Sequence, residues 1–191
     1  MPNTRNLKSL NVQQELLTVL SRRLQSSIYK LDLQKGCAMN KINIFTDGAC
    51  SGNPGDGGWA AILVCGNNKK EISGFEPNTT NNRMELMAVI KAIECIKIPS
   101  EIKIFSDSAY VVNAFNQKWI ENWITSGWKT SGRKPVQNKE LWIQLLSLIK
   151  KQTRVEFVKV KGHSDNELNN RCDKLATSEY LKRSNLNGSK V

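Results

Sequence analysis

The sequence predicts an α/β fold with a five-stranded mixed sheet flanked by helices. Three strand-like segments follow one another between Lys41 and Phe75 with only turn-forming residues between them, so they should pair as an antiparallel meander. Two further strand-like segments, 102–105 and 154–160, are each reached through helical patterns, the usual connection between parallel strands. A chain of 191 residues, 39% of them hydrophobic, suits one such domain with an appendage better than two full domains.

The meander occupies the residues before position 76. An apolar segment at 42–45 leads to Asp47, and the stretch 48–58 that follows is rich in glycine and other turn formers. The second strand is expected at 59–65 and the third at 69–75, because the Gly-Asn-Asn between them has the composition of a hairpin turn.

Helices connect the later strands. Thr79 and Thr80 are N-cap candidates for a helix whose apolar residues recur at helical spacing and which should end near Ile98 and Pro99. The remaining elements are expected in this order: a strand at 102–105, a helix from Ser108 towards Phe115, a Trp-rich basic stretch at 118–139, a helix at 138–151, a strand at 154–160 and a closing helix at 167–182.

Residues 1–38 should form a basic, peripheral extension before a domain at 39–183 and a frayed tail at 184–191. The extension carries six basic residues against two acidic ones, and its apolar residues recur at helical intervals: Leu10, Leu17, Leu20, Leu24, Ile28 and Leu31. Such an amphipathic helix suits attachment to a membrane surface, organelle targeting or partner docking, and the favoured interpretation is a loosely attached extension. Met39 directly precedes the first strand and is a natural beginning for the domain.

The composition favours a nucleic-acid partner and a reducing compartment. The chain has 28 Lys and Arg against 17 Asp and Glu, which favours a polyanionic partner, although a merely soluble basic protein fits the charge as well. Five cysteines without a C-x-x-C pair argue against a zinc site or a disulfide framework. No apolar run approaches the roughly 18 residues of a membrane span and no signal-peptide pattern is seen, so we expect a cytoplasmic protein without a membrane partner.

Four carboxylates occupy four separate motifs, and three of them end or follow a strand-like run or lie on the helix just after one. They are Asp47, Glu85, Asp107 and Asp173. Acids placed in this way converge at one edge of a sheet, where their charges repel one another unless a cation neutralises them. Mg²⁺ binds a few carboxylates together with substrate phosphate oxygens. The pattern therefore indicates a metal site that cuts an anionic polymer.

These motifs resemble, in order and approximate spacing, those of type 1 ribonuclease H in its bacterial form. They are Asp47-Gly48 with Gly52-Asn53-Pro54-Gly55, Thr79-Thr80-Asn81-Asn82-Arg83-Met84-Glu85-Leu86, Asp107-Ser108, Trp128-Lys129-Thr130, and Val160-Lys161-Gly162-His163 followed by Asp173. The resemblance covers about residues 41–180. The second motif and the Lys-Gly-His segment with its downstream Cys-Asp are specific, whereas an Asp-Gly turn alone is common.

The resemblance implies a ribonuclease H-like sheet with strand order 3-2-1-4-5 and a monomer that hydrolyses the RNA strand of RNA–DNA hybrids, leaving 5′-phosphate and 3′-hydroxyl ends. Two Mg²⁺ ions, for which Mn²⁺ is a possible substitute, would act with the substrate bound. Asp47 would bridge both ions, Glu85 and Asp107 would hold the nucleophile-side ion, and Asp173 would help to hold the other. His163, the only histidine, would assist proton transfer or product release.

Substrate contacts follow from the same resemblance. The 2′-hydroxyl distinguishes RNA from DNA, and asparagines and backbone groups would read it across the minor groove. Basic residues interleaved with tryptophans at 118–139 would grip the hybrid. The implied substrate-binding residues are Cys50, Asn53, Thr80, Asn81, Asn82, Trp119, Trp128, Lys129, Arg133 and Lys134. Ala109 stands where bacterial relatives usually carry Gln, and one extra residue precedes Trp119. We expect Trp123 and Trp142 to be core residues.

Three other functions remain open from the sequence. A non-catalytic nucleic-acid-binding module gains nothing from four acids facing phosphates. Another nuclease or integrase of the same broad fold would lack the Trp-Lys-Thr protrusion and the Lys-Gly-His segment. A domain excised from a reverse transcriptase is conceivable, but the residues before Met39 are too few for a polymerase.

Overall fold

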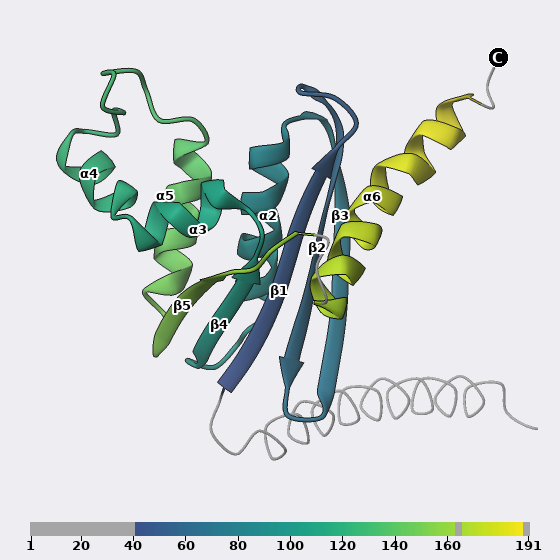
Figure 1. Cartoon of the computed structure of the whole chain (residues 1–191), viewed down its shortest axis with the longest axis horizontal. Coiled ribbons are helices and arrows are strands. Elements are labelled where there is room, and N and C mark those ends of the chain that lie inside the picture. Colours follow the sequence, from purple (N-terminus) through teal and green to yellow (C-terminus); the bar gives the residue numbers. More distant parts are fainter. Residues whose placement is uncertain (1–40, 163–165, 189–191) are drawn as a thin grey trace, which may run out of the picture. The chain divides into compact units, whose positions relative to one another are not determined.

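The protein forms a five-stranded mixed sheet with strand order β3-β2-β1-β4-β5, as expected (Figure 1). The computed structural model describes residues 41–162 and 166–188. β1 pairs antiparallel with β2, and β2 with β3, whereas the β1–β4 and β4–β5 pairs are parallel. The strands are β1 (Lys41–Cys50), β2 (Gly55–Cys65), β3 (Asn68–Thr79), β4 (Glu101–Ser106) and β5 (Arg154–Lys159).

Helices cover both faces of this sheet. They are α2 (Asn81–Glu94), α3 (Ala109–Asn116), α4 (Trp119–Thr125), α5 (Lys139–Ile149) and α6 (Glu167–Gly188). On one face, buried residues of α2, α3 and α5 pack on Ile44 and Ile104. On the other face, Cys172 and Ala176 of α6 pack on Ala60 and Ile62. Figure 1 shows α6 apart from the other helices, over the β2 and β3 side. Successive side chains of a strand point to opposite faces of the sheet, so the strands contribute residues to two separate cores.

The helix starts agree with the sequence better than the helix ends. Thr80 caps α2 by accepting a hydrogen bond from the Arg83 N–H, and Ser108 caps α3 through the Val111 N–H. α2 ends at Glu94, earlier than the Ile98 expected, and α6 continues to Gly188. The helix α4 lies in the Trp-rich stretch for which the sequence predicted no helix.

β1 and β2 extend into the stretch that was expected to be a turn. Gly57 and Gly58 pair with Cys50 and Ala49 in the antiparallel ladder. A Cβ at Gly58 would collide with the Ala176 carbonyl oxygen, and one at Gly57 would meet the Thr79 side chain. These glycines therefore allow close packing of neighbouring segments, so their presence misled a prediction that treated glycine as a turn signal.

The cysteines only partly follow the expectation. Cys50, Cys95 and Cys172 are free thiols, but Cys65 at the end of β2 is disulfide-bonded. The absence of a C-x-x-C spacing excludes a local pair of cysteines and does not exclude a bond between cysteines far apart in the sequence. Within residues 41–162 and 166–188, no helix is long and apolar enough to cross a membrane. The extension predicted at 1–38 lies outside the described residues.

Candidate active site

All four predicted acids line one pocket of about 260 Å³ at the ends of the two central strands. Its lining is almost entirely polar and consists of Asp47, Gly48, Ala49, Asn81, Glu85, Asp107, Asn169, Asn170 and Asp173. The residues come from β1, α2, the end of β4 and α6. Segments far apart in the chain therefore meet where the parallel strands end, the usual place for a site in an open α/β sheet.

The register of β1 and β4 brings Asp47 and Asp107 side by side. Phe45 pairs with Phe105 in the parallel ladder, and their rings stack with centroids 4.9 Å apart. Each aspartate lies two residues further along its chain, and side chains two residues apart in a strand share a face. Lys159, at the end of β5, donates a hydrogen bond to the backbone carbonyl of Asp107 and so fixes the end of β4.

Glu85 reaches the pocket because α2 packs directly on Gly48. A Cβ at Gly48 would collide with the backbone of Met84 and Glu85, so only glycine lets the helix come this close. The Glu85 carboxylate is then held from both sides. Asn81 Nδ2 donates to one oxygen at 2.9 Å, and Ser108 Oγ donates to the other at 2.5 Å. The cap of α3 thus also orients an acid of the pocket.

α6 presents Asp173 to the pocket because the side of the helix next to Asp173 is anchored in the core. Cys172 is fully buried, and its thiol donates to the Phe45 carbonyl oxygen at 3.3 Å. Burial raises the pKa of this thiol to about 12, so it stays a neutral donor. Asn169, one turn before Asp173, is 2% exposed and lines the same pocket.

The electrostatics of the pocket favour the binding of a cation. Burial, together with repulsion from Asp107 and, to a lesser degree, Asp173 and Glu85, raises the pKa of Asp47 to about 8, although the Gly48 N–H bond lowers it. Burial and then Asp107 also raise the pKa of Glu85, against the Ser108 hydrogen bond. A positive ion in the pocket would reverse both shifts, because it stabilises the charged carboxylates.

The donor set fits a hard divalent cation. The side chains available are carboxylates and carboxamides, and oxygen ligands are those that Mg²⁺ prefers. In the described part of the chain, no three acidic, cysteine or histidine side chains already form a compact ligand cluster. The four acids line a pocket of about 260 Å³, which has room for water and substrate oxygens.

The other predicted residues are distributed around this pocket. Asn81 lines it, whereas Thr80 caps α2 and Asn53 lies in the exposed turn between β1 and β2. Asn82 is partly buried in the first turn of α2. The Cys50 thiol donates hydrogen bonds to the backbone carbonyl oxygens of Gly55 and Thr79. His163 lies outside the described residues. Gly162 just before it packs against Asp107, since a Cβ there would lie 2.7 Å from Oδ2.

The basic stretch separates into an exposed turn and a buried support. Lys129, Arg133 and Lys134 are exposed, on a turn closed by hydrogen bonds between Thr130 and its neighbours. Trp119, Trp123 and Trp128 pack against the main core, and Trp142 is fully buried within it, as expected for Trp123 and Trp142. The tryptophans named as substrate contacts thus also hold the turn in place.

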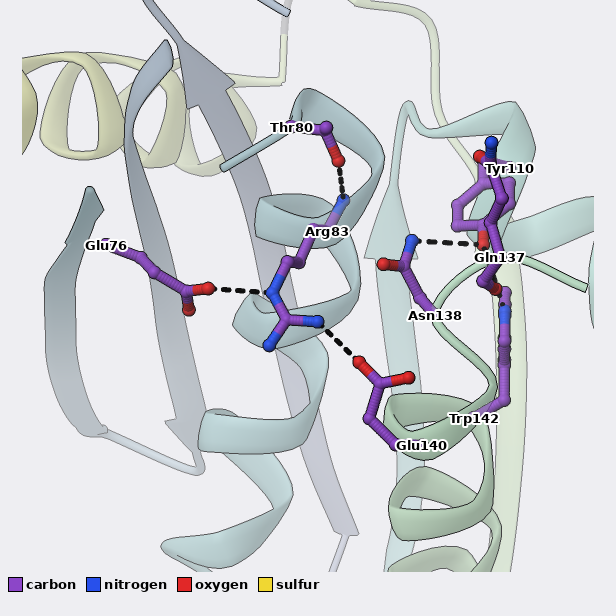
Figure 2. A network of polar contacts seen from close by, with 8 residues as sticks. All are labelled: Glu76, Thr80, Arg83, Tyr110, Gln137, Asn138, Glu140 and Trp142. Atoms are coloured by element: carbon purple, nitrogen blue, oxygen red, sulfur yellow. Dashed lines mark hydrogen bonds and ion pairs between the residues drawn. The ribbon is translucent and has the colours of Figure 1, made fainter. Parts of the chain in front are cut away.

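Arg83 ties α2 to β3 and α5 (Figure 2). Its Nε lies 2.7 Å from Glu76 and its Nη1 lies 2.5 Å from Glu140. Next to it, the Tyr110 hydroxyl donates to the Gln137 carbonyl and accepts from Trp142 Nε1 and Asn138 Nδ2. The figure shows these contacts at the point where the basic stretch returns to α5. The Arg83–Glu140 pair fixes that return against α2, which carries Glu85, and the Tyr110 contacts fix it against α3.

Sequence reasoning missed three residues of the site. Asn169 and Asn170 precede Asp173 by four and three positions, so helical spacing alone places them on its side of α6. Ser108 was expected only as a helix start, and nothing local signals its bond to Glu85.

The sheet order and the acid-lined pocket together define a nuclease of the ribonuclease H-like fold. The chain belongs to the RNase H family, whose model matches residues 39–180, and it is a ribonuclease H of the bacterial type 1 form.

A curated relative gives the same family, and solved structures share the fold. A "Ribonuclease H" of Acetivibrio thermocellus is 60% identical over 146 residues, 76% of this chain and 99% of that protein. A crystal structure of a type 1 RNase H with the type 2 active-site motif has 25% identity and a TM-score of 0.67, covering 75% of this chain and 74% of the other. A second RNase H, solved in complex with RNA/DNA hybrid, has 24% identity and a TM-score of 0.57, covering 74% and 98%.

Proposed function

We propose that this protein is an endonuclease that hydrolyses the RNA strand of RNA–DNA hybrids by a two-metal-ion mechanism, leaving 5′-phosphate and 3′-hydroxyl ends. The observation that carries the proposal is the convergence of four carboxylates on one open pocket. A protein that only bound nucleic acid would lose affinity from such a cluster, because it repels phosphates. Membership of the RNase H family supports the same substrate class.

The position of each acid in the pocket would decide which metal ion it binds. Asp47, flanked by Asp107 and Asp173, would contact both ions; Glu85 and Asp107 would hold one, and Asp173 the other. Bound Mg²⁺, or Mn²⁺ in its place, would supply a nucleophilic hydroxide and stabilise the leaving oxygen. Asn81 and Ser108 keep Glu85 in a fixed orientation, so its charge need not be reoriented during reaction.

The substrate would lie across the pocket and the basic turn. Asn81 borders the acids, so its amide, with Asn82, Asn53 and the backbone near Cys50, would read the RNA strand. Thr80 and Asn53 would contact a phosphate of the DNA strand. The exposed charges of Lys129, Arg133 and Lys134 would bind phosphates, with Trp119 and Trp128 as their support. His163 would assist proton transfer or product release.

We further propose that the enzyme acts as a cytoplasmic monomer without a membrane partner. In the described residues the pocket takes its acids from a single chain, so no second copy is needed to complete it. Sedimentation of the full chain with and without a hybrid duplex tests the monomeric state. If the chain that cleaves the hybrid sediments as a dimer, the proposal is contradicted.

The function is tested by cleavage of matched RNA–DNA, RNA–RNA and DNA–DNA duplexes with Mg²⁺ and with EDTA. We expect cutting only of the RNA strand in the hybrid, only with the metal, and with 5′-phosphate ends on the products. Asp47→Asn should remove nearly all turnover and leave the protein folded, because it deletes the charge shared by both ions. Substantial activity of a folded Asp47→Asn protein would contradict the two-ion assignment.

A further inference from the structure

Asn169, a side chain of the pocket, has no role in the proposed function. Asn169 is 2% exposed, lines the pocket with the four acids, and its Oδ1 has no hydrogen-bond partner. A buried carboxamide oxygen without a donor is unfavourable, because it has lost its hydrogen bonds to water. Its presence beside four carboxylates indicates that a donor arrives with a ligand.

The backbone holds Asn169 rigidly in this place. Its N–H donates to the Asn166 side-chain oxygen at 3.1 Å, a cap that fixes the first turn of α6. Asp173 follows one turn later on the same side of the helix. Cys172, bonded to the Phe45 carbonyl, holds that turn against β1. The backbone of Asn169 therefore keeps a fixed place one turn before Asp173.

The chemistry of the pocket restricts what the donor can be. Asp47, Glu85, Asp107 and Asp173 are acceptors when charged, and an acceptor oxygen gains nothing from them. A hydrated divalent cation attracted by these acids brings waters whose hydrogens point outward. Mg²⁺ keeps several of its waters when it binds to protein carboxylates, and those waters need acceptors.

We infer that Asn169 is a positioning residue for the cation beside Asp173: its Oδ1 accepts a hydrogen bond from a water carried by that ion. The inference rests on the proposed function in one respect, that a divalent cation enters the pocket. Groups that orient metal ligands and metal-bound waters typically change metal affinity by about 10- to 100-fold when removed.

Mg²⁺ binding to the full chain tests this role without any measurement of cleavage. Mg²⁺ titrations followed by calorimetry and by melting temperature would compare the wild-type chain with Asn169→Ala and with Asn169→Leu, which keeps the side-chain volume. Ser178→Ala, in the same helix and away from the pocket, is the matched control. Asp47→Asn reports separately whether the acids bind Mg²⁺ at all.

We expect both Asn169 variants to bind Mg²⁺ about tenfold more weakly, and Ser178→Ala to bind it as the wild type does. The metal-free melting temperature of Asn169→Leu should stay equal or rise, since the lost oxygen was unpaired.

Two results would overturn the inference while leaving the proposed function intact. One is unchanged Mg²⁺ affinity in both variants. The other is a lower metal-free melting temperature in both with an unchanged Mg²⁺-induced increase, which would mean that the amide donates to a carboxylate as a structural bond. If the wild type binds no Mg²⁺, the proposed function and the inference fail together.

Discussion

Burial and the neighbouring carboxylates act on the pKa of Asp47 in the same direction, since both raise it. Its pKa of about 8 means that the metal-free protein keeps this carboxyl protonated at neutral pH. A cation that binds must displace this proton, so metal binding and proton release are linked. Cation affinity should therefore increase with pH up to about the pKa of Asp47.

This shift predicts how Asp47→Asn changes stability. The folded pKa of Asp47, about 8, lies above the ordinary value of 3.8, so the stability that this group contributes is fully present below 3.8 and is lost as pH rises towards 8. Removing the ionisable group should raise the metal-free melting temperature by about 5 °C near pH 8.5 and by much less near pH 4. Calorimetric scans at the two pH values check this, and an equal change at both would contradict it.

Gly48 is the residue most sensitive to a single added methyl group. Gly48→Ala would press a Cβ into the backbone of Glu85 and Met84, which cannot move as a flexible side chain would. We expect a loss of about 2–3 kcal/mol of unfolding free energy and a large fall in kcat, because Glu85 is displaced. Denaturant unfolding measures the first. Gly132→Ala is the control, since only the Thr130 hydroxyl lies near, at 3.9 Å; it should change stability little.

Among the individual residues of the pocket, the four acids could be predicted from the sequence, but some of the residues that orient or border them could not. Asp47 and Asp107 were recognisable because each follows an apolar strand, and Glu85 because of the motif around it. Asn169 has no such signal, since its significance depends on burial and on an unpaired oxygen. The bond from Ser108 to Glu85 joins residues 23 positions apart and requires the packed fold.

Among the elements, α2 is the connection between the acids and the substrate-binding segments. It carries Glu85 and Asn81 into the pocket, is capped by Thr80, and is tied through Arg83 to β3 and α5 (Figure 2). A displacement of α2 would therefore disturb the proposed metal ligands and the proposed phosphate contacts together.

Arg83→Ala should lower stability by about 1–2 kcal/mol. Its two ion pairs are partly exposed and are screened by solvent, so most of the loss comes from two broken hydrogen bonds and lost packing of the side-chain stem. Arg83→Lys should recover less than half of this, because one ammonium cannot reach both acids with the guanidinium geometry. The midpoints of denaturant unfolding of the wild type, Arg83→Lys and Arg83→Ala measure these losses of stability. Lys103→Ala breaks a longer, more exposed pair with Glu156 and should cost almost nothing.

The basic turn predicts a specific dependence on salt. Neutralising Lys129, Arg133 and Lys134 together should raise KM and flatten its dependence on salt by about one unit of slope per lost phosphate contact. The kcat should change much less, because the acids lie elsewhere.

Neutralising Lys41, Lys103 and Arg154 removes the same charge from the opposite ends of β1, β4 and β5 and serves as the control. That change should shift KM only slightly. Equal effects of the two triple changes would mean that overall charge, and no local contact, governs binding.

Strand interiors could be predicted from the sequence, but strand ends and short helices could not. The alternation in β4 and β5 is clear, whereas Gly57 and Gly58 have the composition of a turn and yet pair as a strand. α4 has only seven residues. Its N-cap residue, Lys118, has a φ of 58°, and its side chain makes no capping hydrogen bond. Such a helix cannot be predicted from the periodicity of its apolar residues or from an N-cap side chain.

For the whole molecule, the described elements from β1 to α6 contain both cores and the acid pocket. The RNase H family match begins at residue 39, just before β1. The domain beginning at Met39 is therefore expected to be sufficient for folding and for catalysis.

A protein that starts at Met39 should melt within a few degrees of the full chain and cleave hybrids with nearly the same kcat. Residues 1–38 carry six basic and two acidic residues, so their removal takes four of the +11 net charges and should weaken hybrid binding modestly at low salt. That difference should fade as ionic strength rises. Aggregation or a large loss of melting temperature after truncation would show that the leucines at positions 10–31 belong to the core.

The pocket draws its acids from positions 47, 85, 107 and 173, and the last of them lies on the final helix. A ribosome releases these positions in order, so a growing chain lacks one of the four pocket acids until α6 has emerged and packed on β1. Any hybrid cutting that needs all four acids is therefore withheld during synthesis. Nuclease activity would then appear only in finished molecules, and the onset of cutting in a translation reaction would report the completion of the fold.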